Sequence, residues 1–251
     1  MKLTGNTIFI TGGGTGIGRG LAESLHKLGN KVIISGRRKE HLDATTKGNP
    51  GMDSVELDIS DPANITAVTT KLIADYPALN VLINNAGIML IDDAARKIDD
   101  QLLTSTVTTN LLGPIRLTSA LIEHLKKQPN AAIIYNTSAL AFVPLALTAV
   151  YSSTKAALHS YVLSQRYKLK GSSVSVLEIA PPWVQTDLLN SKEEPRAMPL
   201  KDFIEQTMKL LAADANEIVV EQAKGFRDNP GPNESALVTQ FNDSMIGVSP
   251  Q

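Results

Sequence analysis

Residues 7–23 read Thr-Ile-Phe-Ile-Thr-Gly-Gly-Gly-Thr-Gly-Ile-Gly-Arg-Gly-Leu-Ala-Glu, and this stretch decides the fold. An apolar, β-rich run enters a glycine loop containing Gly12, Gly16 and Gly18, and a helical pattern follows at once. Glycines let the backbone turn sharply and approach a ligand, while the free N–H groups and dipole of a helix N-terminus favour negative charge. The stretch therefore predicts a strand, a phosphate-binding turn and a helix. The alternative is a glycine-rich turn without a ligand.

Short apolar runs alternate with helical patterns along much of the remaining chain. The predicted strands are Thr7–Ile10, Lys31–Ser35, Ser54–Leu57, Val81–Asn84, Ala131–Asn136 and Ser173–Ile179. The predicted helices are Gly18–Leu28, Ala63–Tyr76, Gln101–Lys127 and Ser152–Lys168. Several strands are apolar on successive residues, as is typical of a parallel sheet buried on both faces. The alternation predicts an α/β fold, a single-domain Rossmann-type doubly wound parallel sheet with helices on both faces.

The composition excludes several classes of function. A formal net charge of −1 over 251 residues provides no long-range field for nucleic acid or an anionic membrane. The sequence contains no cysteine, which excludes disulfides and thiolate catalysis, and no apolar stretch approaches the ~18 residues of a membrane span. The four histidines have no metal-ligand spacing. We expect a soluble cytoplasmic protein without a signal peptide or a metal, forming one domain over residues 1–251.

The end of the second predicted strand indicates which dinucleotide would bind. Folds that bind NAD usually carry Asp or Glu here to bond the ribose 2′-hydroxyl, but this sequence reads Ser35-Gly36-Arg37-Arg38. A guanidinium binds a 2′-phosphate through two hydrogen bonds, whereas a carboxylate would repel it. We therefore expect NADP(H), with NAD(H) as the alternative. The alternative is two solvent-exposed arginines at a strand–helix junction, but the missing acidic residue favours NADP(H).

A second constellation lies further along the chain. Tyr151 and Lys155 are four residues apart, which places them on one face of a helix, and no other tyrosine has a lysine at this spacing. Such a pair alone is more often an ordinary helix surface. Ser138 lies 13 residues before Tyr151, directly after a predicted strand, and Asn110 lies inside the preceding helical segment. This order favours a catalytic site.

Together these motifs resemble the short-chain dehydrogenase/reductase family. The resemblance is carried by Thr-Gly-x-x-x-Gly-x-Gly at residues 11–18, Asn-Asn-Ala-Gly at 84–87 and Tyr-x-x-x-Lys at 151–155, and it extends from Asn6 to Asp187. It implies an oxidoreductase that transfers hydride between a nicotinamide cofactor and a ketone or secondary alcohol, as a carbonyl reductase or alcohol dehydrogenase. It also implies a homodimer or homotetramer. The alternative is a non-catalytic NADP(H)-sensing regulatory protein, although a sensor has no use for Tyr151.

The resemblance assigns a catalytic tetrad of Asn110, Ser138, Tyr151 and Lys155. Tyr151 would give a proton to the developing alkoxide, with the nearby Lys155 ammonium lowering a phenol pKa that is ordinarily near 10. Ser138 would donate to the carbonyl oxygen. Asn110 would hold a water that links Lys155 to solvent, or would be a polar residue that kinks its helix.

The resemblance also implies the cofactor contacts. These are Gly12, Gly14, Thr15, Gly16, Ile17, Gly18, Arg37, Arg38, Asp58, Ile59, Asn85, Ala86, Gly87, Tyr151, Lys155, Pro181, Val184 and Thr186. Asp58 would contact the adenine edge, but an Asx turn or a helix cap explains it equally well, with Ser60 and Asp61 competing as the cap.

The C-terminal part departs from the family pattern. Pro181-Pro182 replaces the usual Pro-Gly and resembles a branch containing oxidoreductases associated with D-alanylation. We expect residues 188–251 to form a substrate lid and a variable C-terminal part. Residues 190–199 are the predicted lid, with a disordered surface insertion as the alternative, and residues 200–212 are a predicted amphipathic helix. Apolar substrate contacts are expected from Met89, Leu140, Val143, Trp183 and Leu188, for which core packing is an equally good explanation.

Overall fold

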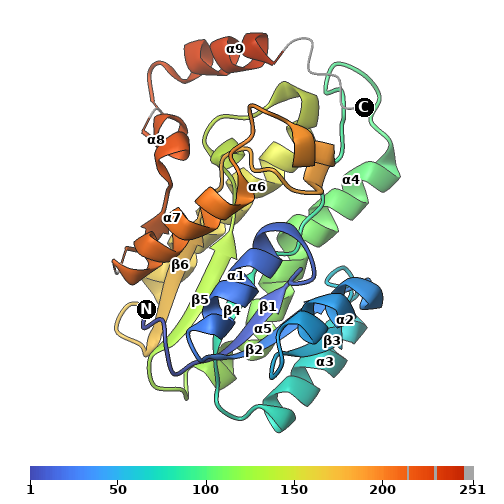
Figure 1. The fold of residues 1–251 in the computed structure, drawn as a ribbon. Helices are drawn as coiled ribbons and strands as arrows, with labels where there is room; N and C mark the ends of the chain where they lie inside the picture. Colours follow the sequence, from blue (N-terminus) through green and yellow to red (C-terminus); the bar gives the residue numbers. More distant parts are fainter. Residues whose placement is uncertain (214, 229–230, 246–251) are drawn as a thin grey trace.

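The computed structural model describes residues 1–213, 215–228 and 231–245 (Figure 1). Its centre is one parallel sheet with the strand order β3-β2-β1-β4-β5-β6-β7. The strands are β1 Thr7–Thr11, β2 Lys31–Gly36, β3 Asp53–Glu56, β4 Leu79–Asn84, β5 Ala131–Asn136, β6 Val174–Ile179 and β7 Glu217–Ile218. The predicted doubly wound α/β fold is therefore confirmed.

Helices cover both faces of the sheet, as the unbroken apolar strands predict. The α-helices are α1 Gly16–Lys27, α2 Lys39–Gly48, α3 Pro62–Asp75, α4 Asp100–Val107, α5 Gly113–Leu125, α6 Ala149–Lys168, α7 Leu200–Ala212, α8 Glu221–Arg227 and α9 Glu234–Ser244. Successive residues of β1 point to opposite faces: Ile8 and Ile10 pack with Leu21 of α1 and Phe203 of α7. Phe9 packs on the other side, in the core formed with α3, α5 and α6.

The strand order places a crevice at the centre of the sheet. The chain moves outward from β1 to β2 and β3, then returns to pair β4 with the other edge of β1. At such a reversal the connections after the two neighbouring strands leave in opposite directions, and ligands bind outside the carboxyl ends of the strands. The glycine loop after β1 and residues 84–87 after β4 both lie at this point.

One predicted helix is interrupted. The segment predicted at Gln101–Lys127 forms α4, a π-helical turn at Thr108–Leu112, and α5. The turn contains Asn110, whose side chain binds the main chain of Ile88. A polar side chain that inserts into the main-chain hydrogen bonding can distort a helix in this way. Single π-helical turns inside α-helices are frequent at functional sites.

The C-terminal part is more regular than its sequence suggests. Helix α7 has the predicted bounds, and α8 and α9 follow the short strand β7. Figure 1 shows α9 at one end of the molecule, far from α2 and α3. The sequence Asn229-Pro230-Gly231-Pro232-Asn233 also predicts a surface loop, and part of it lies outside the described residues. Across the described ranges, no helix has both the length and the apolarity needed to cross a bilayer.

Candidate active site

The glycine loop after β1 forms a narrow turn against the start of α1. Gly12 and Gly16 have φ values of +67° and +53°, in the left-handed region that favours glycine. A β-carbon on Gly18 would lie 2.2 Å from the Gly12 carbonyl oxygen, so this position accepts no side chain. At the start of α1, the Thr15 side chain makes no capping hydrogen bond with any described residue. The first N–H groups of α1 therefore remain available to an anion.

Asn85 connects the loops that follow three neighbouring strands. Its Nδ2 donates to the carbonyl oxygens of Thr11 at 2.9 Å and Gly12 at 3.2 Å. Its Oδ1 accepts a 2.8 Å hydrogen bond from Asn136 Nδ2 at the end of β5. The side chain thus fixes the glycine loop relative to β5, from which the chain continues to Ser138.

Tyr151 and Lys155 lie on one face of α6, and both are buried. Burial raises the pKa of Tyr151 to about 12, and a hydrogen bond with the Ser138 side chain acts in the opposite direction. Lys155 Nζ donates to the Asn136 carbonyl oxygen at 2.9 Å and lies 5.4 Å from the centre of the Tyr151 ring. Burial lowers the pKa of Lys155 to about 8. The three side chains form a compact group able to exchange a proton.

Asn110 is held by two main-chain contacts. Its Nδ2 donates to the Ile88 carbonyl oxygen at 2.8 Å, and its Oδ1 accepts from the Ile88 N–H at 2.9 Å. A β-carbon on Gly87 would approach Asn110 Oδ1 to 3.3 Å and Lys155 Nζ to 3.8 Å. Asn110 and the Lys155 ammonium group therefore lie on the same side of Gly87. The helix that contains Asn110 is locally distorted, as expected if this polar residue kinks it. The water relay stays a prediction.

A cavity of about 860 Å³ joins the glycine loop to this group. Every predicted cofactor contact lines it. So do Ser138 and four predicted substrate contacts: Met89, Leu140, Trp183 and Leu188. Asn110 does not line the cavity, but its side chain is hydrogen-bonded to the main chain of Ile88, which does. Val143 does not line the cavity but is buried with Phe142 and Ala180, so core packing is the explanation that fits this residue.

At one end of the cavity, exposed Arg37 and Arg38 follow β2. Within the described residues, neither guanidinium forms an ion pair or hydrogen bond. Asp58 Oδ1 accepts from the N–H of Ser60 at 2.9 Å and from its hydroxyl at 2.6 Å, which is the Asx turn that the sequence left open. Burial raises the pKa of Asp58, but these hydrogen bonds and the Arg37 charge outweigh it and hold the pKa below its ordinary value. Asp61 caps α3 instead.

Residues 190–199, the predicted lid, contact the loop that follows β6, and their role as a lid stays a prediction. Trp183 Nε1 donates to Ser191 Oγ at 2.7 Å, and the Arg196 guanidinium lies 5.3 Å from the Trp183 ring centre. An isolated bridge joins Val184 to Met198 and closes the segment at its base. The residues that follow the sixth strand are thereby fixed over one end of the cavity.

Several residues of the cavity wall were not predicted from the sequence. The apolar end is completed by Leu145, Leu147, Phe226, Phe241 and Met245. An amphipathic helix pattern shows that one face is buried but not against which part of the fold, so no sequence signal placed α8 and α9 here. The ring of His159, one of the four histidines without metal-ligand spacing, binds buried Glu178, a contact that was not predicted. Among the described residues, no group of three or more histidines and carboxylates could hold a metal ion.

Comparison with known proteins agrees with this geometry. Residues 6–197 match the short chain dehydrogenase family. The chain is 37% identical to an uncharacterized oxidoreductase, DltE, of Bacillus subtilis (strain 168), over 96% of this chain and 98% of that protein. It is 29% identical to the 3-oxoacyl-[acyl-carrier-protein] reductase FabG of Escherichia coli (strain K12), over 75% of this chain and 77% of that protein.

A solved structure agrees as well. A short-chain dehydrogenase from Burkholderia cenocepacia J2315, in complex with NADP, superimposes with a TM-score of 0.84 and 25% identity, covering 96% of this chain and 98% of that one. The resemblance found in the glycine loop and the Tyr151–Lys155 pair is therefore confirmed, and the chain is an oxidoreductase of the short-chain dehydrogenase family.

Proposed function

We propose that this chain is an NADP(H)-preferring carbonyl reductase or alcohol dehydrogenase acting on a ketone or secondary alcohol with apolar groups. The observation that carries the proposal is the buried pair Tyr151 and Lys155, whose ammonium lies 5.4 Å from the centre of the tyrosine ring. Both side chains line the same cavity as the glycine loop and Ser138. A nicotinamide dinucleotide fits the residues present because the loop admits no side chain at Gly18 and the start of α1 offers free N–H groups.

The proposed mechanism assigns one task to each polar side chain. The bound dinucleotide would supply or accept the hydride. Ser138 would donate a hydrogen bond to the substrate oxygen, and Tyr151 would transfer a proton to that oxygen as negative charge develops on it. Lys155 would favour the ionised phenol by its positive charge and so lower the pKa that burial raises to about 12. Asn110, anchored on Ile88, would hold the water through which the proton is replaced.

The preference for NADP(H) is supported by charge. Arg37 and Arg38 line the cavity where the adenosine ribose would lie, and a 2′-phosphate would complete their hydrogen bonding. The Burkholderia cenocepacia relative is in complex with NADP. The substrate preference is supported by Phe226 and Phe241 at the other end of the cavity and by similarity to reductases of 3-oxoacyl groups.

The experiment is a substrate panel run with both cofactors. Purified protein should oxidise NADPH in the presence of aryl and alkyl ketones, with a higher kcat/KM for NADPH than for NADH. Tight NADPH binding without turnover of any ketone or alcohol would support the sensor alternative. A preference for NADH would remove the role proposed for the two arginines.

We further propose a homodimer or homotetramer. Leu163 and Tyr167 of α6 are large apolar side chains with 43% and 76% of their surface exposed, as expected of a face that a second copy covers. Sedimentation equilibrium tests this: a concentration-independent monomer mass would contradict it.

A further inference from the structure

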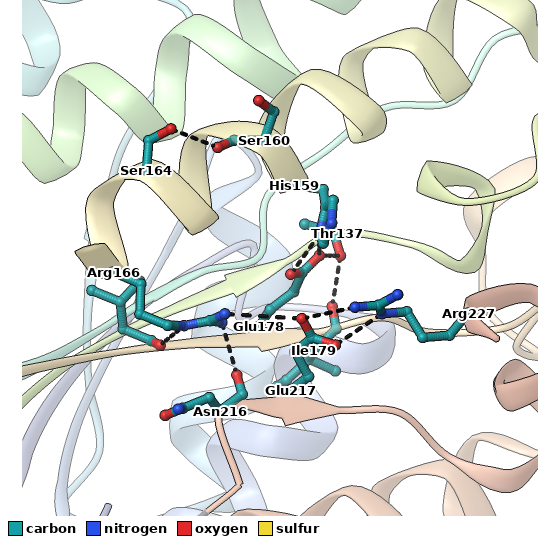
Figure 2. Close-up of polar contacts among 11 residues, drawn as sticks. Thr137, His159, Ser160, Ser164, Arg166, Glu178, Ile179, Asn216, Glu217 and Arg227 are labelled. Atoms are coloured by element: carbon teal, nitrogen blue, oxygen red, sulfur yellow. Dashed lines mark hydrogen bonds and ion pairs between the residues drawn. The ribbon is translucent and has the colours of Figure 1, made fainter. Parts of the chain in front are cut away.

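A buried carboxylate lies behind the proposed catalytic group and has no role in the mechanism above. Glu178, on β6, has 1% of its surface exposed. Its Oε1 accepts a 2.6 Å hydrogen bond from the Thr137 hydroxyl, and its two oxygens lie 2.8 and 3.0 Å from His159 Nδ1 (Figure 2). An ionised carboxylate only accepts hydrogen bonds, so Nδ1 carries the proton in this pairing. A buried carboxylate destabilises the fold unless such hydrogen-bond partners surround it.

The contacts of Glu178 lead directly to the catalytic residues. Its partner Thr137 lies between Asn136, whose carbonyl oxygen accepts from Lys155 Nζ, and Ser138, which lines the cavity together with Tyr151. His159 follows Lys155 by one turn of α6, on the same face of the helix. The carboxylate therefore ties β6 to the end of β5 and to α6 at the level of the catalytic group.

The charge of Glu178 also acts on Lys155. The ammonium is buried, and its hydrogen bond goes to the neutral carbonyl of Asn136. Burial lowers the pKa of Lys155, and the negative charge of Glu178 raises it. Loss of that charge would leave the lysine neutral at a lower pH.

We propose that Glu178 is a positioning residue for the oxidoreductase reaction: it keeps Lys155 charged through space and, through Thr137, fixes the segment that carries Ser138. The inference rests on the proposed function for its catalytic consequence. Its electrostatic part concerns the protein alone and is testable without substrate.

Other charged groups face the same region. His159 and Lys155 approach from α6. Arg227 approaches from α8, where its hydrogen bond with Glu217 and, to a smaller extent, the charge of Glu178 raise its pKa. Glu217 of β7 is paired in register with Glu178, but its carboxylate is partly exposed and binds Arg227 at 2.9 Å and Arg166 at 3.9 Å (Figure 2). Glu217 therefore provides a matched control, because its loss removes the same charge from the same cluster without touching Thr137 or His159.

The test is a pH titration of the cofactor-free protein carrying lysine labelled with carbon-13 at Cε. The Lys155 signal is identified by its absence in Lys155→Met. In Glu178→Gln, the midpoint of this titration should fall by about one pH unit or more, a tenfold change in the acid dissociation constant. Glu217→Gln should leave it within about 0.3 unit of wild type. Glu178→Asp keeps the charge and should recover more than half of the shift.

A second measurement links the charge to turnover. If Tyr151 and charged Lys155 deliver the proton, kcat/KM for ketone reduction should decline as pH rises and Lys155 loses its charge. In Glu178→Gln this decline should occur at a lower pH than in wild type, and the difference should equal the shift of the Lys155 midpoint. An unchanged Lys155 midpoint in Glu178→Gln overturns the inference whether or not the protein turns over a substrate. A shifted midpoint in a protein that reduces nothing would instead contradict the proposed function alone. If Glu178→Gln does not fold, Glu178→Asp is the test, because it keeps the negative charge. A Lys155 midpoint that falls by about one pH unit in Glu178→Asp would contradict the proposal.

Discussion

The carbonyl oxygen of Gly12 lies so close to Gly18 that a β-carbon on Gly18 would meet it at 2.2 Å. The same β-carbon would lie 2.4 Å from Asn85 Nδ2, the atom that ties the loop to the strands beside it. Strand β1 and helix α1 can therefore pack at this separation only with hydrogen in place of a side chain. The contact fixes the shape of the loop in which the pyrophosphate is proposed to bind.

Gly18→Ala should consequently weaken dinucleotide binding. The loop has to open to admit the methyl group, which moves the free N–H groups of α1, and the Kd for NADPH should rise at least about tenfold, or about 1.4 kcal/mol. Gly48→Ala is the control, because a β-carbon at Gly48 meets nothing within 4 Å. Calorimetric titration with NADPH measures both variants. Equal affinity in Gly18→Ala and wild type would show that this contact does not shape the binding loop.

Arg37→Asp should reverse part of the cofactor preference. The new carboxylate repels a 2′-phosphate and can accept from a ribose hydroxyl, so kcat/KM should fall at least about tenfold for NADPH and change little for NADH. Lys47→Asp makes the same change of charge in the last turn of α2, away from the cavity wall. Steady-state rates with both cofactors decide the outcome. If the ratio of kcat/KM for NADPH to kcat/KM for NADH changes equally in Arg37→Asp and Lys47→Asp, the effect comes from the overall charge of the protein and not from the position of Arg37.

Phe241→Ala should weaken substrate binding and spare the cofactor. Phe241 lines the apolar end of the cavity and packs edge-to-face on Phe226, with ring centres 5.0 Å apart. Loss of this apolar surface should raise the KM for an aryl ketone about fivefold, equivalent to about 1 kcal/mol, with the Kd for NADPH unchanged. Val238→Ala lies on the same helix but not on the cavity wall and should leave KM near wild type. Equal KM values in all three proteins would place the substrate elsewhere.

Lys155 should give the folding stability a distinctive pH dependence. Burial lowers its pKa from 10.5 to about 8, so between these values the unfolded chain binds more protons than the folded one. Stability from this group therefore rises as pH increases through that interval. Relative to Lys155→Met, wild type should gain about 3 kcal/mol of unfolding free energy between about pH 7 and pH 10.5. Urea denaturation at several pH values provides the measurement.

Lys201→Met replaces an exposed lysine of α7 and serves as the control for that series. Its difference from wild type should stay constant over the same pH interval. A constant difference for Lys155→Met as well would mean that the folded protein keeps this lysine as readily protonated as the unfolded chain.

The sequence predicted the sheet well because its strands are decided by local chemistry. Strand β5 was predicted with its observed bounds, since an apolar β-branched run between polar turns has few other structures open to it. The glycine loop was equally clear, because only glycine tolerates its backbone geometry. Helix α2 was not predicted, because Lys39–Gly48 is a largely polar sequence that buries only Leu42 and Thr45.

The parts of the site that the sequence missed depend on tertiary contacts. Phe226 and Phe241 lie far from the glycine loop along the chain, and only the packing of α8 and α9 brings them to the cavity. Glu178 interrupts an apolar strand, a signal that could have marked it, but its partners Thr137 and His159 belong to other elements. Sequence spacing predicts contacts within one helix, such as that between Tyr151 and Lys155. It does not predict contacts between residues of different strands and helices, such as those of Glu178.

The most direct test of the central claim is the rate of ketone reduction by Tyr151→Phe under saturating NADPH. The account predicts a loss of at least about a hundredfold in kcat, because the phenol hydroxyl is the proton donor, while the variant still binds NADPH. Tyr161→Phe, ten residues along the same helix and packed on Tyr135, should retain the wild-type rate. A Tyr151→Phe enzyme that keeps more than about a tenth of the wild-type kcat would contradict the assignment of Tyr151 as the proton donor.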